Sequence, residues 1–254
     1  MTALPHSLDR TVVIRAPRAV VFRFFTDSER FARWWGPGST IDARVGGEVR
    51  IAYPNGVIAR GTVSSLQSDQ VITFTYGYED PQKPIPVGGS VVTITLQDHA
   101  QGTLLQLHHA LPTAAARDQH VPGWRFQLAV FANVVAGEQH AGLAAMADGW
   151  FAAWSEGDPK ARAAMLAGCT SDDVKMQDQW SCLQGRADLD AHIGICLTMA
   201  QGTRMQRLGE PRHCQGTALV DWTASDATGK PRGKGTNVVT LAPDGRIAAV
   251  VGFW

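Results

Sequence analysis

The sequence predicts an α+β protein of two domains, and three observations lead to this class. In the first half, two short helical patterns are followed by a run of strand-like segments and a long helical pattern. In the second half, three helical patterns and one strand precede four further strands. A short glycine-containing stretch, residues 137–142, separates the halves. Because 254 residues can form two cores of ordinary size, we expect domains at residues 1–139 and 140–254.

The composition is that of a globular protein without a charge bias. Hydrophobic residues make up 44% and charged residues 18% of the chain. The 23 basic and 23 acidic residues balance, so neither nucleic acid nor a membrane surface is expected as a partner. No segment approaches the roughly 20 apolar residues of a membrane-spanning helix, and residues 1–10 lack the apolar run of a secretory signal. We therefore expect a cytoplasmic location.

The cysteine and histidine residues give no sign of a metal site. Cys169, Cys182, Cys196 and Cys214 follow no known metal-binding spacing, and we expect reduced thiols that act as small hydrophobic residues. His108 and His109 are adjacent on a predicted strand, so they face opposite sides and cannot hold one ion together. We expect neither a metal nor a cofactor.

The first domain begins with a strand at 11–15 and two short helices. Pro17 opens the first helix, because the missing N–H of proline costs nothing in a first turn. Ser28 is expected to cap the second helix, 29–35, which the Gly-Pro-Gly of 36–38 ends. The apolar stripe of the first helix consists of Val20, Val21, Phe24 and Phe25.

Strand-like segments separated by turn signals follow and predict a curved antiparallel sheet. Asn55 and Gly56 tolerate positive φ and give the strongest hairpin signal. Pro122 and Gly123 open a long helix, 124–135. Its predicted buried side consists of Phe126, Val130, Phe131 and Val134. The expected strands are 40–44, 48–53, 57–66, 71–78, 90–97 and 103–109.

Four stretches of residues 8–137 carry a family resemblance. They read "APRAVVFRFFTDSERFARWWGP", "DARVGGEVR", "TLLQLHHALP" and "PGWRFQLAVFANVV". They resemble the Aha1-like branch of the START/Bet v 1 (SRPBCC) superfamily. The resemblance implies a helix-grip fold, in which a cavity for apolar ligands lies between the long helix and the sheet. Candidate lining residues are Trp35, Phe74, Tyr76, Trp124 and Phe131; the alternative, that these aromatic side chains fill a solid core, stays open.

The second domain begins with helices at 143–155 and 159–166. Leu143, Met146, Ala147, Trp150 and Trp154 follow helical spacing in the first of these. Asp158 caps the second, and Pro159 occupies its first turn. A strand at 174–180, a third helix at 187–200 and strands at 204–208, 217–224, 235–241 and 246–253 complete the domain.

The strand at 174–180 places a carboxylate among apolar residues. A period of two puts Val174, Met176, Asp178 and Trp180 on one face. A buried carboxylate is costly unless it is hydrogen-bonded or its pKa rises, so this strand predicts a pocket. Asp178 is interpreted either as a general base with a raised pKa or as a structural residue bonded to backbone amides or to Arg186.

A second resemblance covers residues 143–254. The stretches "WSEGDPKARAAML", "DDVKMQDQ", "LQGRADLDAHI" and "GTNVVTLAPDGRIAAVVGFW" resemble the SnoaL-like, ketosteroid-isomerase-like branch of the NTF2 superfamily. This resemblance implies a cone-shaped α+β barrel that is open at one end to an apolar substrate. It also implies a homodimer formed through the sheet of the C-terminal domain.

The same resemblance assigns candidate site residues. Asp178 matches the general base of the isomerases, Trp150 matches a tyrosine hydrogen-bond donor, and Asn237 matches a protonated aspartate. Trp150 and Asn237 can donate hydrogen bonds but cannot titrate. His192 is expected at the rim or at the surface, and strand alternation is expected to point Asp221 outward. The remaining predicted lining residues are Trp154, Trp180, Val220 and Trp222.

Together these observations favour the binding of small apolar ligands in one or both cavities, and they leave acid/base chemistry at Asp178 open. One alternative is an enzyme of the isomerase or polyketide-cyclase type that acts on a carbonyl-bearing apolar substrate. The other is a stress or chaperone-associated interaction module, which rests on the Aha1 name alone. Whether the protein is an enzyme stays open.

Overall fold

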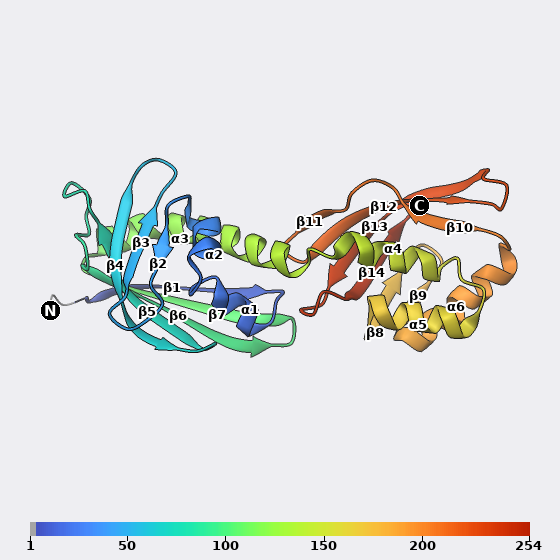
Figure 1. Cartoon of the computed structure of the whole chain (residues 1–254), viewed down its shortest axis with the longest axis horizontal. Coiled ribbons are helices and arrows are strands. Elements are labelled where there is room, and N and C mark those ends of the chain that lie inside the picture. The colour runs from blue at the N-terminus through green and yellow to red at the C-terminus, as the bar shows by residue number, and fades with distance from the viewer. Residues whose placement is uncertain (1–3) are drawn as a thin grey trace. The chain divides into compact units, whose positions relative to one another are not determined.

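The computed structural model describes residues 4–254 and divides the chain into two compact units, up to Ala136 and from Gly137 to Trp254 (Figure 1). Each unit combines helices with one sheet, which confirms the predicted two-domain α+β class. The division lies inside helix α3 (Ala114–Gln139), whereas the sequence placed the boundary between residues 139 and 140.

The sheet of the first unit has seven strands in the order β1-β7-β6-β5-β4-β3-β2, and all neighbours are antiparallel. A bulge between Val63 and Ser65 interrupts the pairing of β4 with β5, and such bulges bend and twist a sheet. The elements before α3 are β1 (His6–Ile14), α1 (Arg18–Arg23), α2 (Ser28–Trp35), β2 (Thr40–Ile41), β3 (Glu48–Ala52), β4 (Ile58–Gln67), β5 (Val71–Tyr78), β6 (Ser90–His99) and β7 (Gly102–Leu111).

Two predicted helix starts in this unit were wrong. Helix α3 begins at Ala114 rather than 124, because Thr113 acts as its cap and accepts a hydrogen bond from the backbone N–H of Ala116 at 3.1 Å. Pro122 therefore lies inside the helix, where its missing N–H removes one backbone bond. Helix α2 is capped by Asp27, whose carboxylate accepts from the Arg30 N–H at 2.9 Å. Ser28 instead exchanges hydrogen bonds with the backbone of Ile41.

The core of the first unit is rich in aromatic rings from α1, α2 and α3. The Phe131 ring lies 4.7 Å from that of Phe25 and 4.8 Å from that of Trp34, measured between ring centroids. The buried stripe of α3 includes Trp124, Leu128, Phe131 and Val135, which share this core with the sheet. Phe126, predicted on the buried side, is 68% exposed because it lies outside this stripe.

The second unit has three helices and a mixed sheet (Figure 1). The strand order is β10-β12-β13-β14-β8-β9, with β11 also paired to β12. Strands β14 and β8 are parallel, and the other pairs are antiparallel. The elements are α4 (Leu143–Ala153), α5 (Pro159–Cys169), β8 (Thr170–Gln177), β9 (Cys182–Gln184), α6 (Arg186–Met199), β10 (Arg204–Arg207), β11 (Arg212–Cys214), β12 (Thr217–Ser225), β13 (Pro231–Leu241) and β14 (Ile247–Phe253).

This second sheet is open. The edge strands β9 and β10 have only three and four residues and do not pair with each other in the described part of the chain. The cone predicted as a barrel is therefore not closed by backbone hydrogen bonds. Its core is formed by residues of α4, α5 and α6 packed against buried residues of β8, β12, β13 and β14.

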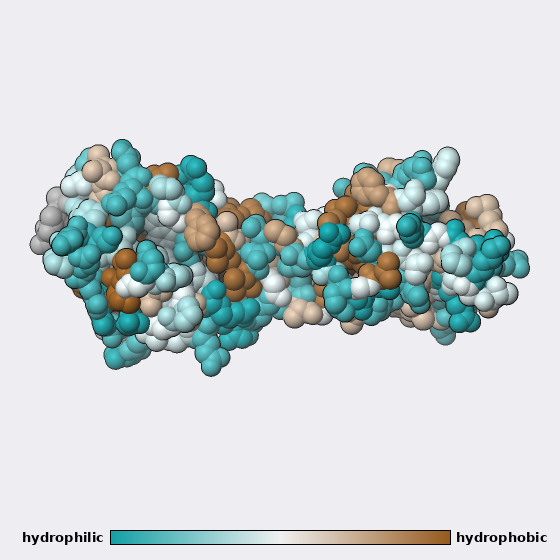
Figure 2. Space-filling model, turned by 90° about the horizontal axis from the view of Figure 1, so that it is seen from above, coloured by the Kyte–Doolittle hydropathy of each residue, from teal (hydrophilic) through white to brown (hydrophobic). Residues whose placement is uncertain are grey.

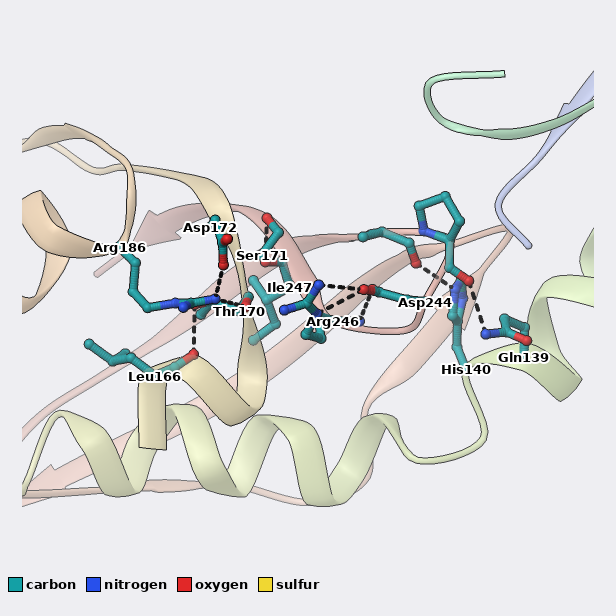
Figure 3. A network of polar contacts seen from close by, with 12 residues as sticks. Gln139, His140, Leu166, Thr170, Ser171, Asp172, Arg186, Asp244, Arg246 and Ile247 are labelled. Atoms are coloured by element: carbon teal, nitrogen blue, oxygen red, sulfur yellow. Dashed lines mark hydrogen bonds and ion pairs between the residues drawn. The ribbon is translucent and has the colours of Figure 1, made fainter. Parts of the chain in front are cut away.

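Two polar clusters tie the ends of these elements together (Figure 3). Arg186, at the start of α6, donates to the Thr170 carbonyl at 2.8 Å and to the Asp172 carboxylate at 2.5 Å. At the end of α3, Gln139 donates to the Pro243 carbonyl at 2.9 Å, and His140 Nε2 lies 3.2 Å from the Ala242 carbonyl. In the first cluster Arg186 is bound to Thr170 and Asp172. Arg186 is therefore not the hydrogen-bond partner of Asp178 that the sequence offered as one alternative.

The surface carries scattered hydrophobic groups. Figure 2 shows brown, hydrophobic areas among teal, hydrophilic ones on both units. Large exposed side chains include Trp180, Met199, Phe253 and Trp254 in the second unit. Within residues 4–254, no helix combines the length and the hydropathy that crossing a membrane requires.

Candidate functional site

The second unit contains a cavity of about 300 Å³ that brings together most of the residues predicted for its site. Helix α4 contributes Trp150 and Trp154, and Asp178 follows the end of β8. Strands β12 and β13 contribute Trp222 and Asn237. Residues far apart in sequence thus surround one space that is large enough for a small organic molecule.

Two predicted lining residues are elsewhere. Val220 is buried in the packed core, and Trp180 is 77% exposed and does not line the cavity. The reason is that β8 ends at Gln177, so strand periodicity no longer applies to Asp178 and Trp180. The chain turns there, and the Asp178 N–H donates to the Ser181 carbonyl at 3.0 Å.

The carboxylate of Asp178 stabilises this turn. Its Oδ1 atom accepts hydrogen bonds from the backbone N–H groups of Trp180 and Ser181, both at 2.8 Å, and from the Ser181 hydroxyl at 2.7 Å. Such side chain to backbone bonds are typical of aspartate in turns. Of the two interpretations of Asp178, this geometry matches the residue bonded to backbone amides.

The pKa of the Asp178 carboxyl is lowered from its ordinary value. Partial burial acts to raise this pKa, but the hydrogen bonds from Ser181 and from the Trp180 N–H, with a further one from the Trp254 side chain, outweigh it. Asp178 is therefore ionised at neutral pH. The raised pKa expected of a general base is absent from this carboxyl because its donors stabilise the charged form.

The other polar groups of the cavity are mainly donors. The Asn237 Oδ1 atom accepts from the Trp222 indole N–H at 3.2 Å, which leaves the Asn237 NH₂ as a donor. The Trp154 indole N–H is buried and has no hydrogen-bond partner within residues 4–254. An incoming carbonyl oxygen could satisfy either group.

Cys196 was not predicted as a site residue, yet it also lines this cavity. Its sulfur lies 3.4 Å from Nε2 of His192, one helical turn earlier on α6. The His192 ring lies 6.0 Å from that of Trp154, and His192 is half-buried. Burial, and then the charge of Asp178, raise the pKa of the Cys196 thiol, which keeps it protonated. The i, i+4 spacing of His192 and Cys196 was the signal that could have indicated the pair.

The first unit contains a larger cavity of about 490 Å³. Of the five residues predicted to line it, Trp35, Tyr76 and Trp124 do so. Phe74 and Phe131 are fully buried in the core and do not reach the cavity. Three of the predicted aromatic side chains therefore line the cavity, and the other two fill the core.

Hydrogen bonds fix the hydroxyl and imidazole groups beside this cavity. The Tyr53 and Tyr76 hydroxyls are 2.8 Å apart. His120 Nδ1 lies 2.7 Å from the Ala116 carbonyl, which can only accept, so Nδ1 carries the proton. His120 Nε2 then accepts from the Tyr78 hydroxyl at 3.1 Å. Burial lowers the pKa of His120, so the ring is neutral.

A second histidine, His109, does not line the first cavity but forms a hydrogen bond with the lining residue Trp124. The Trp124 indole donates to His109 Nδ1 at 2.9 Å, so His109 Nε2 carries the proton and donates to the Ser90 hydroxyl at 2.9 Å. Burial lowers the pKa of His109 to about 3, and the nearby His120 and His108 act in the same direction. This network fixes the orientation of Trp124. Among the described residues, no group of three or more His, Cys, Asp or Glu side chains could hold a metal ion.

The protein is of the two-domain α+β class, and each domain has a cavity lined largely by apolar side chains. A comparison with protein families gives a match for the first domain. Residues 15–136 match the model of the family described as Activator of Hsp90 ATPase homolog 1-like protein. The first unit is thus an Aha1-like domain, as its sequence motifs indicated. Among curated proteins, no match to the chain was found.

Three of the solved structures that are similar to this chain are described here by identity, coverage and TM-score. A protein of the SnoaL-like family from Agrobacterium tumefaciens is 27% identical, with a TM-score of 0.42, over 46% of this chain and 97% of that chain. Protein CV1439 from Chromobacterium violaceum is 26% identical, with a TM-score of 0.45, over 52% and 98%. The Aha1 dimer from Colwellia psychrerythraea is 14% identical, with a TM-score of 0.42, over 48% and 90%.

Proposed function

We propose that this protein binds small apolar molecules in its two cavities. The observation that carries the proposal is the cavity of the second unit, where Trp150, Trp154 and Trp222 surround about 300 Å³. Burial of apolar ligand surface against such walls contributes about 25 cal/mol per Å². The larger cavity of the first unit, with Trp35 and Trp124 in its wall, supports the same activity.

The polar groups of the second cavity favour a ligand with two kinds of hydrogen-bonding group. Besides the bonds from Trp180 and Ser181, which end on Oδ1, and the bond from the Trp254 side chain, the ionised Asp178 can accept a bond from a ligand hydroxyl. The Asn237 NH₂ and the Trp154 N–H can donate to a ligand carbonyl. A mainly apolar hydroxy-ketone or hydroxy-aldehyde therefore matches this cavity best.

An isomerase-type enzyme is the second candidate, and the meeting of Asp178, Trp150 and Asn237 at one cavity favours it. The lowered pKa of Asp178 speaks against it, since a strong general base needs a proton affinity near the working pH. Turnover of a panel of enones and β-hydroxyketones by the unmodified protein, abolished in Asp178→Asn, would favour the enzyme. Equal binding by both proteins without turnover would favour the binding protein.

A titration with 6-hydroxy-2-acetonaphthone, an aromatic hydroxy-ketone, tests ligand binding. We expect Trp154→Ala to weaken binding in the second cavity about tenfold, which is about 1.4 kcal/mol. Trp180→Ala is the matched control, because it removes an exposed indole that does not line the cavity. Calorimetry measures the affinity of the probe for the unmodified protein and for each of the two variants. An unchanged affinity in Trp154→Ala, or no binding by the unmodified protein, would contradict the proposal.

The proposal includes a homodimer formed through the second domain. Phe253 and Trp254, 60% and 58% exposed at the end of the chain, support an apolar contact there. Light scattering after size-exclusion chromatography measures the mass. A dimer that becomes a monomer in Phe253→Ser is expected, and a monomeric unmodified protein would contradict it.

A further inference from the structure

A row of hydrogen-bonded side chains borders the first cavity and begins at His120. His120 Nδ1 donates to the Ala116 carbonyl at 2.7 Å, so Nε2 has no hydrogen and accepts from the Tyr78 hydroxyl at 3.1 Å. A phenol has a single hydrogen, so the Tyr78 oxygen can only accept in any further bond. The Tyr76 hydroxyl is hydrogen-bonded to Tyr78 and is therefore the donor to it.

The row ends at Tyr53, whose hydroxyl lies 2.8 Å from that of Tyr76. Because the Tyr76 hydrogen is directed to Tyr78, Tyr53 is the donor in this contact. Burial raises the pKa of both the Tyr53 and the Tyr76 hydroxyl, so each keeps its hydrogen at neutral pH. The Tyr53 oxygen can then accept a hydrogen bond but has no hydrogen to give, and it has no further partner within residues 4–254.

This row fixes the positions of hydrogens and does not transfer protons. Its inner end is the Ala116 carbonyl, which accepts a hydrogen bond but does not take up a proton. Burial lowers the pKa of His120 and keeps the ring neutral. Tyr53 therefore presents a hydrogen-bond acceptor to the cavity, rather than an acid or a base.

Trp35 supplies a donor next to this acceptor. Its side chain lines the cavity and is 5% exposed, and its indole N–H is buried without a hydrogen-bond partner in the described part of the chain. The Trp35 and Tyr53 rings lie 5.7 Å apart between centroids and are inclined by 84°. A buried donor without a partner costs free energy, which a ligand oxygen would recover.

The group that matches both side chains is a hydroxyl. One hydroxyl oxygen can accept from the Trp35 N–H while its hydrogen is donated to the Tyr53 oxygen. An ether or a ketone can only accept, and a hydrocarbon does neither. The rest of such a ligand would lie against apolar lining residues such as Trp124 and Val130.

We infer that the first cavity binds an apolar alcohol or phenol, whose hydroxyl is held between Trp35 and Tyr53. This inference rests on the proposed function and names the class of ligand for one cavity. The row from His120 to Tyr53 sets the specificity, because it directs the Tyr53 hydrogen away from the ligand.

Three probes with the same aromatic body test the inference: 2-naphthol, 2-methoxynaphthalene and naphthalene. The indole N–H signal of Trp35 in ¹H–¹⁵N NMR spectra reports on the first cavity alone, and its nuclear Overhauser contacts with the Tyr53 ring assign it. We expect 2-naphthol to bind the unmodified protein about tenfold more tightly than the ether. We expect 2-naphthol, unlike naphthalene, to move the indole proton signal downfield, as a hydrogen bond does.

Two variants test the direction of the hydrogen bonds. Tyr53→Phe removes the acceptor, so the preference for 2-naphthol over the ether should disappear. Tyr78→Phe frees the Tyr76 hydrogen to turn toward Tyr53, which can then donate to a ligand, so the preference should decrease. Thr73→Val is the control, because it removes a hydroxyl of β5 that does not line the cavity. Circular dichroism checks the fold of each variant.

The two proposals fail in different ways in this experiment. Equal affinities of the unmodified protein for 2-naphthol and the ether, or a preference that survives in Tyr53→Phe, would overturn the hydroxyl inference and leave apolar binding in place. If none of the three probes changes the Trp35 signal, both proposals for the first cavity are wrong. The comparison of probes on the unmodified protein does not depend on the folding of any variant.

Discussion

The hydroxyl of Ser181 should help to keep the pKa of Asp178 low. In Ser181→Ala, the 2.7 Å hydrogen bond to Asp178 Oδ1 is lost, while both backbone N–H bonds remain. A hydrogen bond to a charged group contributes about 1.5–3 kcal/mol when buried. Because Asp178 is only partly buried, we expect a smaller loss of about 1 kcal/mol in the free energy of unfolding at neutral pH.

The pH dependence of this loss has a defined sign. The pKa of Asp178 is lower in the folded chain than in the unfolded one. Its contribution to stability is therefore complete above the unfolded value, about pH 3.9, and decreases as the pH falls through the folded value. In Ser181→Ala the folded pKa rises toward the unfolded one. The difference in stability between the two proteins should then shrink in acid.

Two measurements test this prediction. Urea unfolding from pH 2.5 to 7 gives the stability difference, and ¹³C NMR of the aspartate carboxyls gives the pKa of Asp178 directly. Ser181→Thr is the matched control, since it keeps the hydroxyl. An Asp178 pKa that is the same in Ser181→Ala and in the unmodified protein would refute the assigned role of the Ser181 hydroxyl.

Three other predictions concern buried groups. Phe131→Ala should reduce the free energy of unfolding by about 3–5 kcal/mol, whereas Phe126→Ala on the same helix should change it by less than about 1; similar urea midpoints would contradict the assigned core. The pKa of His109 is about 3 when folded and about 6.5 when unfolded, so the unfolded chain binds the proton first. His109 therefore lowers the stability below about pH 6.5 by up to about 1.4 kcal/mol per pH unit, in addition to the contributions of His120 and His213, whose pKa values burial also lowers. His109→Gln should reduce the slope of stability against pH in urea unfolding by the share of His109, and an unchanged slope would exclude a contribution from His109. Iodoacetamide at neutral pH should modify exposed Cys182 well before Cys196, whose pKa is raised; mass spectrometry measures both rates, and the reverse order would indicate an activated Cys196 thiol.

Local patterns predicted which residues would meet at the second cavity. Helical spacing placed Trp150 and Trp154 on one stripe of α4, and strand alternation placed Asn237 on the inner face of β13. These patterns depend only on neighbours along the chain. The family resemblance supplied the pairing of these elements with Asp178, which periodicity alone does not give.

The exact end of strand β8 was not predictable from the same patterns. Apolar alternation continues through Trp180, but the turn begins at Asp178 because its carboxylate bonds to the N–H groups of the next residues. Asp178 and Ser181 in the sequence Asp-Gln-Trp-Ser are a local turn signal that competes with alternation. A turn at Asp178 places Trp180 outside the cavity, whereas continued strand alternation would place it inside.

The division between core and cavity in the first unit depends on tertiary packing. Phe131 and Trp124 lie on one face of α3, and both are buried. Phe131 meets rings from α1 and α2, which fill the space around it. Trp124 contacts Trp35 and His109 at the edge of the cavity. Sequence spacing assigns both residues to the same face and cannot separate these surroundings.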